Sequence, residues 1–211
     1  MGRSGAKPGK HWAEVMRRMD FLRGGAVALA GAMAGSAIMV SARPAASHPV
    51  IPNTPVFDQS GRRLHFYDDL IHGKAVLLNF FYTSCGDTCP LVTQNLREVQ
   101  DILGPRMGQD IHMVSVTLQP ELETPEILRD YVGLWDIRPG WTFLTGRPED
   151  IDQLRRATGF ADSEPDVAGN VDSHTGMVRY GNDRLDRWGC AAGTGRPAWI
   201  AKAVTMLADM G

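Results

Sequence analysis

Apolar positions along the chain fall into runs that suit buried strands and runs that are spaced for helices. Residues 75–82 (AVLLNFFY) are almost continuously apolar, which is typical of a central strand covered on both faces. Residues 111–118 form a second such run and residues 141–144 a shorter one. From Pro90 the spacing becomes helical and ends at Gly104-Pro105, with one apolar stripe made of Leu91, Leu96, Val99, Ile102 and Leu103.

Turn and helix-start signals complete the order of elements. Residues 57–66 predict a hairpin around Ser60-Gly61, and 175–180 with 184–188 predict another around residues 181–183. Further helices are expected from Thr124-Pro125, over 149–157 up to Gly159, and over 198–207. Alternating strands and helices that finish with a hairpin predict a three-layer α/β domain with a central mixed sheet and an added N-terminal hairpin, over residues 48–211.

Residues 1–47 have the layout of an export signal. A polar stretch containing Arg17-Arg18 precedes an uncharged, Ala- and Gly-rich run over 24–42, and small residues follow at 43–47. The paired arginines suggest the twin-arginine route. The segment is either cut off, with Ala45 and Ser47 as the small residues before the cut, or kept as a membrane anchor; a buried helix is the remaining reading. Export places the domain in the periplasm, free or anchored to the inner membrane and facing the periplasm.

Charge separates these two parts of the chain. Residues 1–47 carry a net charge of +5, and the remainder carries −7. The predicted domain also has no basic cluster interleaved with aromatic residues that would follow a phosphate backbone. We therefore exclude nucleic acid as a partner.

The candidate chemistry lies in Cys85-Gly86-Asp87-Thr88-Cys89-Pro90, directly after the strongest predicted strand and before a helix. Open α/β sheets bind ligands at this position. Pro90 suits a first helical position, so we expect Cys89 at the N-cap and Cys85 in the turn before it. The helix N-terminus favours a thiolate, which is both a nucleophile and a metal ligand. A plain disulfide is the alternative, although so short a loop gives little entropic stabilisation.

Several segments together resemble the Sco/SenC copper chaperones. They are residues 82–90 (YTSCGDTCP), 117–126 (TLQPELETPE), 144–146 (LTG) and a single downstream His174, so the resemblance covers roughly 55–207. It implies a thioredoxin-like fold, export with a membrane tether, and delivery of copper to the binuclear copper centre of cytochrome c oxidase. It also implies that Cys85, Cys89 and His174 are the copper ligands.

The residue types suit that metal. Thiolates select Cu(I), and an added imidazole gives a site that can also hold Cu(II), whereas zinc usually takes a fourth ligand. Asp172 could orient the second ring nitrogen of His174. On this hypothesis the protein holds one copper ion, is not an enzyme, and has as partners the copper subunit of the oxidase or a similar acceptor and a periplasmic thiol reductant.

Two other functions remain open at this stage. Cys85 and Cys89 could instead be the catalytic pair of a thiol-disulfide oxidoreductase that reduces a periplasmic partner. A peroxidase-like thioredoxin relative is a further alternative. Cys190 could be an extra ligand, a resolving thiol or a small buried side chain, and we expect the last.

Overall fold

The structure is a computed structural model that describes residues 51–84, 86, 88–160 and 176–211. Within these residues seven strands form one sheet in the order β2-β1-β5-β4-β3-β6-β7. β3 (Ala75–Phe81) lies parallel to β4 (Ile111–Thr117), which lies parallel to β5 (Trp141–Thr145). The remaining pairs are antiparallel. The predicted α/β class with a central mixed sheet is confirmed.

The added hairpin is also confirmed. β1 (Pro55–Asp58) pairs with β2 (Arg63–His65), and the turn closes where Asp58 Oδ1 accepts hydrogen bonds from the backbone N–H groups of Ser60 and Arg62 at 2.9 and 3.0 Å. Gly61 has a φ of 83°, a conformation that glycine adopts without strain. The next six residues form a π-helix, η2 (Phe66–Ile71), which the alternation of the sequence does not predict.

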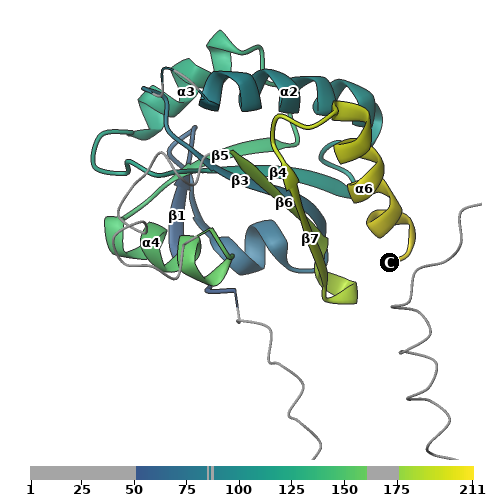
Figure 1. Cartoon of the computed structure of the whole chain (residues 1–211). Helices are drawn as coiled ribbons and strands as arrows, with labels where there is room; N and C mark the ends of the chain where they lie inside the picture. The colour runs from purple at the N-terminus through teal and green to yellow at the C-terminus, as the bar shows by residue number, and fades with distance from the viewer. Residues whose placement is uncertain (1–50, 85, 87, 161–175) are drawn as a thin grey trace, which may run out of the picture. The chain divides into compact units, whose positions relative to one another are not determined.

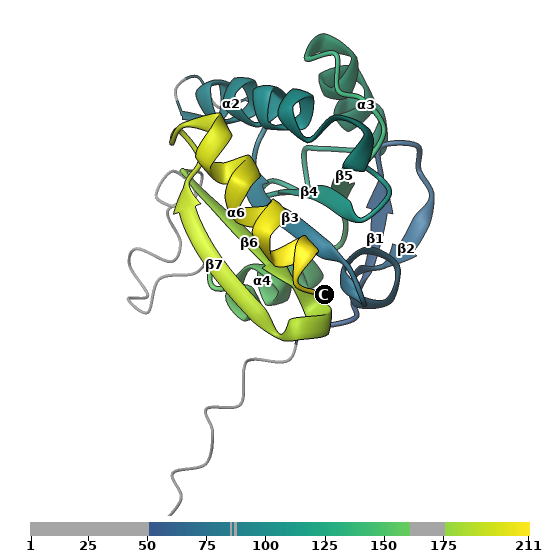
Figure 2. The same cartoon turned by 90° about the vertical axis from the view of Figure 1, so that its right-hand side faces the viewer.

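Helices cover both faces of the sheet, as Figure 1 shows. One face packs against α2 (Thr88–Leu103), α3 (Pro125–Leu134) and α6 (Pro197–Asp209). The other face packs against α4 (Pro148–Ala157) and η2. Figure 2 shows α6 beside α2 on their shared face. A short 3₁₀ turn, η3 (Gly104–Arg106), ends α2. Three layers are thus confirmed.

The stripe predicted for α2 is wrong at two positions. Leu96, Val99 and Leu103 are buried, but Leu91 and Ile102 are 56% and 54% exposed. The buried face of the helix is narrower than the apolar residues suggest, and its members pack in one core with residues of the sheet, α3 and α6.

The C-terminal hairpin is confirmed, but its turn lies further along the chain than predicted. β6 (Met177–Asn182) pairs with β7 (Arg187–Ala192), and the 3₁₀ turn η5 (Asp183–Leu185) connects them. Gly181 lies in β6, where it pairs with Trp188. A glycine is needed there because a Cβ would lie 2.2 Å from the Trp188 ring. The Asn182 side chain starts the turn by accepting a hydrogen bond from the Arg184 N–H at 3.0 Å.

No helix in the described part of the chain is long and apolar enough to cross a membrane. Residues 1–47 lie outside the described residues, so cleavage, anchoring and the export route stay predictions.

Candidate metal centre

The cysteine motif leaves the carboxyl end of β3, and the segment after β4 meets it at the same edge of the sheet. The chain passes from Phe81 through Thr83 and Ser84 to the first turn of α2. Ser84 and Gly86 are exposed, so this loop is open to solvent. The edge is therefore accessible at the point where the motif was predicted to act.

Cys89 is almost fully buried, with 1% of its surface exposed. It is the second residue of α2 rather than its N-cap, so the predicted N-cap position is wrong. Pro90 is tolerated as the third residue because the first four N–H groups of a helix have no partner inside the helix. Cys89 lies in the first turn of α2, where the positive end of the helix dipole favours a thiolate, and the described residues of that turn include no acidic side chain.

A buried carboxylate holds the loop that leads to Cys85. Glu123, 2% exposed, accepts hydrogen bonds from both the backbone N–H and the hydroxyl of Thr83, the latter at 2.6 Å. Its other oxygen accepts a hydrogen bond from the hydroxyl of Thr117 at the end of β4. Ser84 adds a hydrogen bond of 3.2 Å to the side chain of Gln119. The loop is thus tied to the β4–α3 connection at two successive residues.

Sequence reasoning did not identify Glu123 as part of the site. It precedes the helix start at Thr124-Pro125 and looks like an ordinary polar loop residue. The one available signal was topological: parallel neighbours β3 and β4 end at the same edge, so their following loops must meet there.

The strand that follows residue 175 begins beside the first turn of α2. A Cβ placed on Gly176 would lie 3.9 Å from the methyl group of Thr88. The Gly176 carbonyl accepts a hydrogen bond of 2.7 Å from the Gly193 N–H, and the Asn95 side chain in α2 donates to the Gly193 carbonyl at 2.7 Å. These bonds fix the start of β6 next to the residue that precedes Cys89.

Three of the predicted site residues, Cys85, Asp172 and His174, lie outside the described residues. Among the residues that are described, no three His, Cys, Asp or Glu side chains are grouped so that they could hold a metal ion. The ligand set therefore stays a prediction, and what the structure supplies is the position of Cys89 and of the chain on either side of the other two ligands.

The expectation that Cys190 is a small buried side chain is wrong. Cys190 is exposed on the edge strand β7 and lies opposite Arg179. Both line a cavity of about 230 Å³ next to Phe160, whose ring packs in the core on the α4 side of the sheet. Cys89 packs in the core on the α2 side, so the sheet separates these two cysteines. Cys190 is not placed to resolve or to share a ligand with Cys89.

Known proteins match the chain in sequence. The sequence model of the SCO1/SenC family matches residues 55–180, which is more than half of the chain. The SCO2-like protein RP587 of Rickettsia prowazekii is 32% identical over 96 residues, 46% of this chain and 44% of that protein. Protein SenC of Rhodobacter capsulatus is 32% identical over 84 residues, 40% of this chain and 37% of that protein. The chain spans less than half the length of these two relatives.

Solved structures match the fold. A SCO1/SenC family lipoprotein from Bacillus anthracis aligns with a TM-score of 0.60 and 21% identity, over 78% of this chain and 99% of that one. Copper-bound ScoI from Bradyrhizobium japonicum aligns with a TM-score of 0.58 and 22% identity, over 74% of this chain and 99% of that one. At this identity the likeness shows the fold alone, and the family match carries the assignment: the chain belongs to the SCO1/SenC family.

Proposed function

We propose that this protein binds one copper ion through Cys85, Cys89 and His174 and passes it to an acceptor protein. One observation carries the proposal: Gly176 lies against Thr88, next to Cys89. His174 is two residues from Gly176, so covalent geometry keeps their Cα atoms within about 7 Å of each other. An imidazole at position 174 is therefore within reach of the cysteine motif, although about 85 residues of sequence separate them.

The chemistry of the donor set supports copper. Two thiolates and one imidazole suit Cu(I) and tolerate Cu(II). Solved structures of ScoI from Arabidopsis thaliana and from Bradyrhizobium japonicum, which share this fold, contain bound copper. Binding releases protons because cysteine ligands coordinate as thiolates, and the N-terminus of α2 favours that deprotonation.

Loading and release take place from the loop side. Because Cys89 is covered by the core, copper reaches its sulfur past the exposed residues Ser84 and Gly86. Transfer then proceeds by exchange of ligands between this site and the acceptor, without breaking a bond in either protein. The Glu123 hydrogen bonds keep the loop in place while its ligands exchange.

The finer parts of the proposal concern partner and location. The acceptor is the copper subunit of cytochrome c oxidase or a similar exported protein; BsSco, a structural relative, is described as a member of a family of cytochrome c oxidase assembly proteins. The domain works in the periplasm, soluble or tethered by residues 1–47, and a periplasmic thiol reductant keeps its cysteines reduced. A charge of −7 outside residues 1–47 would steer a basic acceptor toward it.

The test is copper affinity of the reduced full chain, measured by competition with a chromogenic Cu(I) chelator. His174→Ala should weaken binding by more than the roughly 10–100-fold that is typical of losing an outer-shell partner. His65→Ala, an exposed histidine on β2, is the matched control and should bind as the wild type does. Wild-type affinity in His174→Ala would contradict the proposal.

The oxidoreductase alternative has its own readout. Fast reduction of a model disulfide by the copper-free, reduced protein, lost in Cys85→Ser and in Cys89→Ser, would assign the pair to thiol-disulfide exchange instead. The copper proposal predicts slow exchange in this assay.

A further inference from the structure

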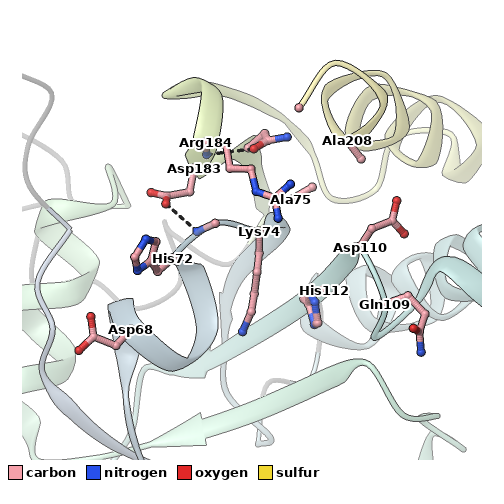
Figure 3. Close-up of a pocket in the computed structure, with 13 residues that line it drawn as sticks. Asp68, His72, Lys74, Ala75, Gln109, Asp110, His112, Asp183, Arg184 and Ala208 are labelled. Carbon is pink, nitrogen blue, oxygen red and sulfur yellow. Dashed lines mark hydrogen bonds between the residues drawn. The ribbon is translucent and has the colours of Figure 1, made fainter.

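A large cavity lies at the opposite end of the sheet from the cysteine motif. Its volume is about 660 Å³, and it opens between the amino ends of β3 and β4 and the turn that follows β6. β3 is seven residues long, so the cavity is roughly 20 Å from the loop that follows that strand. Figure 3 shows its side chains, which come from elements distant in sequence.

Two cationic side chains in this cavity have no carboxylate partner within the described ranges. Lys74 donates a hydrogen bond to the backbone carbonyl oxygen of Asp69, and this carbonyl group is neutral. Arg184 is exposed, and its Nε lies 3.7 Å from a Cβ placed on Gly73. Other arginines form salt bridges in the described chain, but neither Lys74 nor Arg184 takes part in one. Their positive charges are therefore available to a ligand.

The acidic side chains of the cavity are already hydrogen-bonded. The three carboxylates accept from neighbouring groups: Asp183 from the Gly73 N–H at 2.8 Å and the Tyr67 hydroxyl at 3.1 Å, Asp110 from Arg106, and Asp68 from the Asn53 amide at 2.7 Å. The Asp110–Arg106 pair lowers the pKa of that carboxyl and neutralises it locally. Of the three acids only Asp110 has a cationic partner among the described residues, so Asp68 and Asp183 keep their negative charge, and a bound anion has to lie against Lys74 and Arg184.

His112 also lines the cavity and can become a third donor when its ring is protonated. In the view of Figure 3 the Lys74 side chain runs between His72 and His112. Burial lowers the pKa of His112, and the charge of Lys74 lowers it further, so the ring is neutral at pH 7. A hydrogen bond to the Gln109 backbone uses the single N–H of the neutral ring, so its other nitrogen can donate to an anion only after the ring takes up a second proton, which a bound anion would favour.

We propose that this cavity binds a small anion that carries phosphate groups, with Arg184 and Lys74 as the charged donors and His112 beside them. A guanidinium fork matches phosphate oxygens, and an ammonium adds a compact charge from a second direction. Ligand pockets of ~300–1,000 Å³ hold whole small molecules, so the fit is to a pyrophosphate or a phosphate ester rather than to a single phosphate ion. The site is independent of copper.

Isothermal titration of the copper-free full chain with pyrophosphate tests this site. Arg184→Gln and Lys74→Gln should each weaken binding by at least about tenfold, the loss expected for one charge-assisted hydrogen bond. Arg187→Gln removes the same charge from an exposed position on β7 that does not line the cavity, and it should leave affinity unchanged. In the wild type, pyrophosphate should also shift the ring-proton resonances of His112.

Three results would overturn the proposal: no saturable binding of pyrophosphate, equal affinity in Arg184→Gln and the wild type, or equal affinity for citrate, which carries carboxylates only. Arg184 is exposed, so its variant is expected to fold, and an unchanged unfolding midpoint confirms that a loss of binding is local. Repeating the titration with a sugar phosphate distinguishes a site for phosphate esters from a site for free pyrophosphate. Tighter binding of either ligand supports a site for phosphate groups.

Discussion

The two ends of the central sheet are built differently. At the carboxyl end of β3, Cys89 and Glu123 are buried, and Glu123 holds the loop that follows β3 by accepting hydrogen bonds from the backbone N–H and the hydroxyl of Thr83. At the amino end, a cavity of about 660 Å³ holds charged side chains that are open to solvent. This cavity is thus at the opposite end of the sheet from the cysteine motif. A site for one ion needs a well-held loop, whereas a site for a larger solute needs volume.

Glu123 is the strongest way to test the first half of this comparison. Glu123→Gln removes the charge and one of the two acceptor oxygens: with the amide oxygen toward Thr83, the NH₂ group faces the buried Thr117 hydroxyl, which loses its acceptor. The free energy of unfolding should fall by about 3 kcal/mol, measured by urea denaturation, and copper affinity should fall with it. Glu121→Gln, in the same connection but exposed, should change neither quantity. Wild-type stability in Glu123→Gln would show that the loop is held by other contacts.

Gly193 tests how closely the chain before Cys89 and the start of β6 must approach. A Cβ at Gly193 would lie 2.8 Å from Val92 and 3.2 Å from the Gly176 carbonyl. Gly193→Ala should therefore destabilise the fold by about 2 kcal/mol through overpacking and weaken copper binding by moving Gly176 away from Thr88.

Gly133→Ala is the matched control, because nothing lies within 4 Å of a Cβ there and the residue is inside α3. It should raise the free energy of unfolding by about 0.8 kcal/mol, the difference in helix propensity. If Gly193→Ala behaves in the same way as Gly133→Ala, the close approach of α2 and β6 plays no part in the site.

His112 sharpens the comparison from the other end, with a smaller effect. Burial, and then the charge of Lys74, lower its pKa below the ordinary 6.5 in the folded state. The folded protein therefore favours the neutral ring. The resulting contribution to the free energy of unfolding is complete above pH 6.5 and is lost as the pH falls from there toward the folded-state pKa. His112→Asn should flatten the fall in the free energy of unfolding between pH 7 and pH 5 relative to the wild type, and a slope equal to that of the wild type would contradict this account of the ring.

Most of the fold followed from the sequence because its central strands are buried on both faces. The run over 75–82 has an apolar residue at nearly every position, and β3 is buried at all of its positions. Local chemistry was equally clear at Thr124-Pro125, where the Thr124 hydroxyl caps α3. These signals depend on one element at a time, so they can be recognised without knowing the neighbours.

The predictions were wrong where the position of a residue depends on the elements packed around it. Gly181 looked like a turn residue, but it lies in β6, where the lack of a Cβ leaves room for the Trp188 ring. The turn is at residues 183–185 instead. Leu91 looked buried by its spacing, but more than half of its surface is exposed. Cys190 looked like a small core residue, whereas an edge strand exposes it.

The candidate site was predictable in part. The motif and its place after β3 were readable, because a buried strand followed by C-x3-C-P is a local pattern. Glu123 was not, because a buried carboxylate is identified by its donors, and these come from Thr83 and Thr117 on separate segments. The same limit applies to Lys74 and Arg184, which share a cavity only through the sheet topology.

The central claim is the copper ligand set, and X-ray absorption spectroscopy of the full chain loaded with one equivalent of Cu(I) tests it most directly. The account predicts two sulfur ligands and one imidazole nitrogen, with the nitrogen lost in His174→Ala and a sulfur lost in Cys85→Ser and in Cys89→Ser. It predicts no change in Cys190→Ser, because Cys190 lies on the opposite side of the sheet from Cys89. A spectrum without sulfur ligands, or one that changes in Cys190→Ser and not in Cys89→Ser, would contradict it.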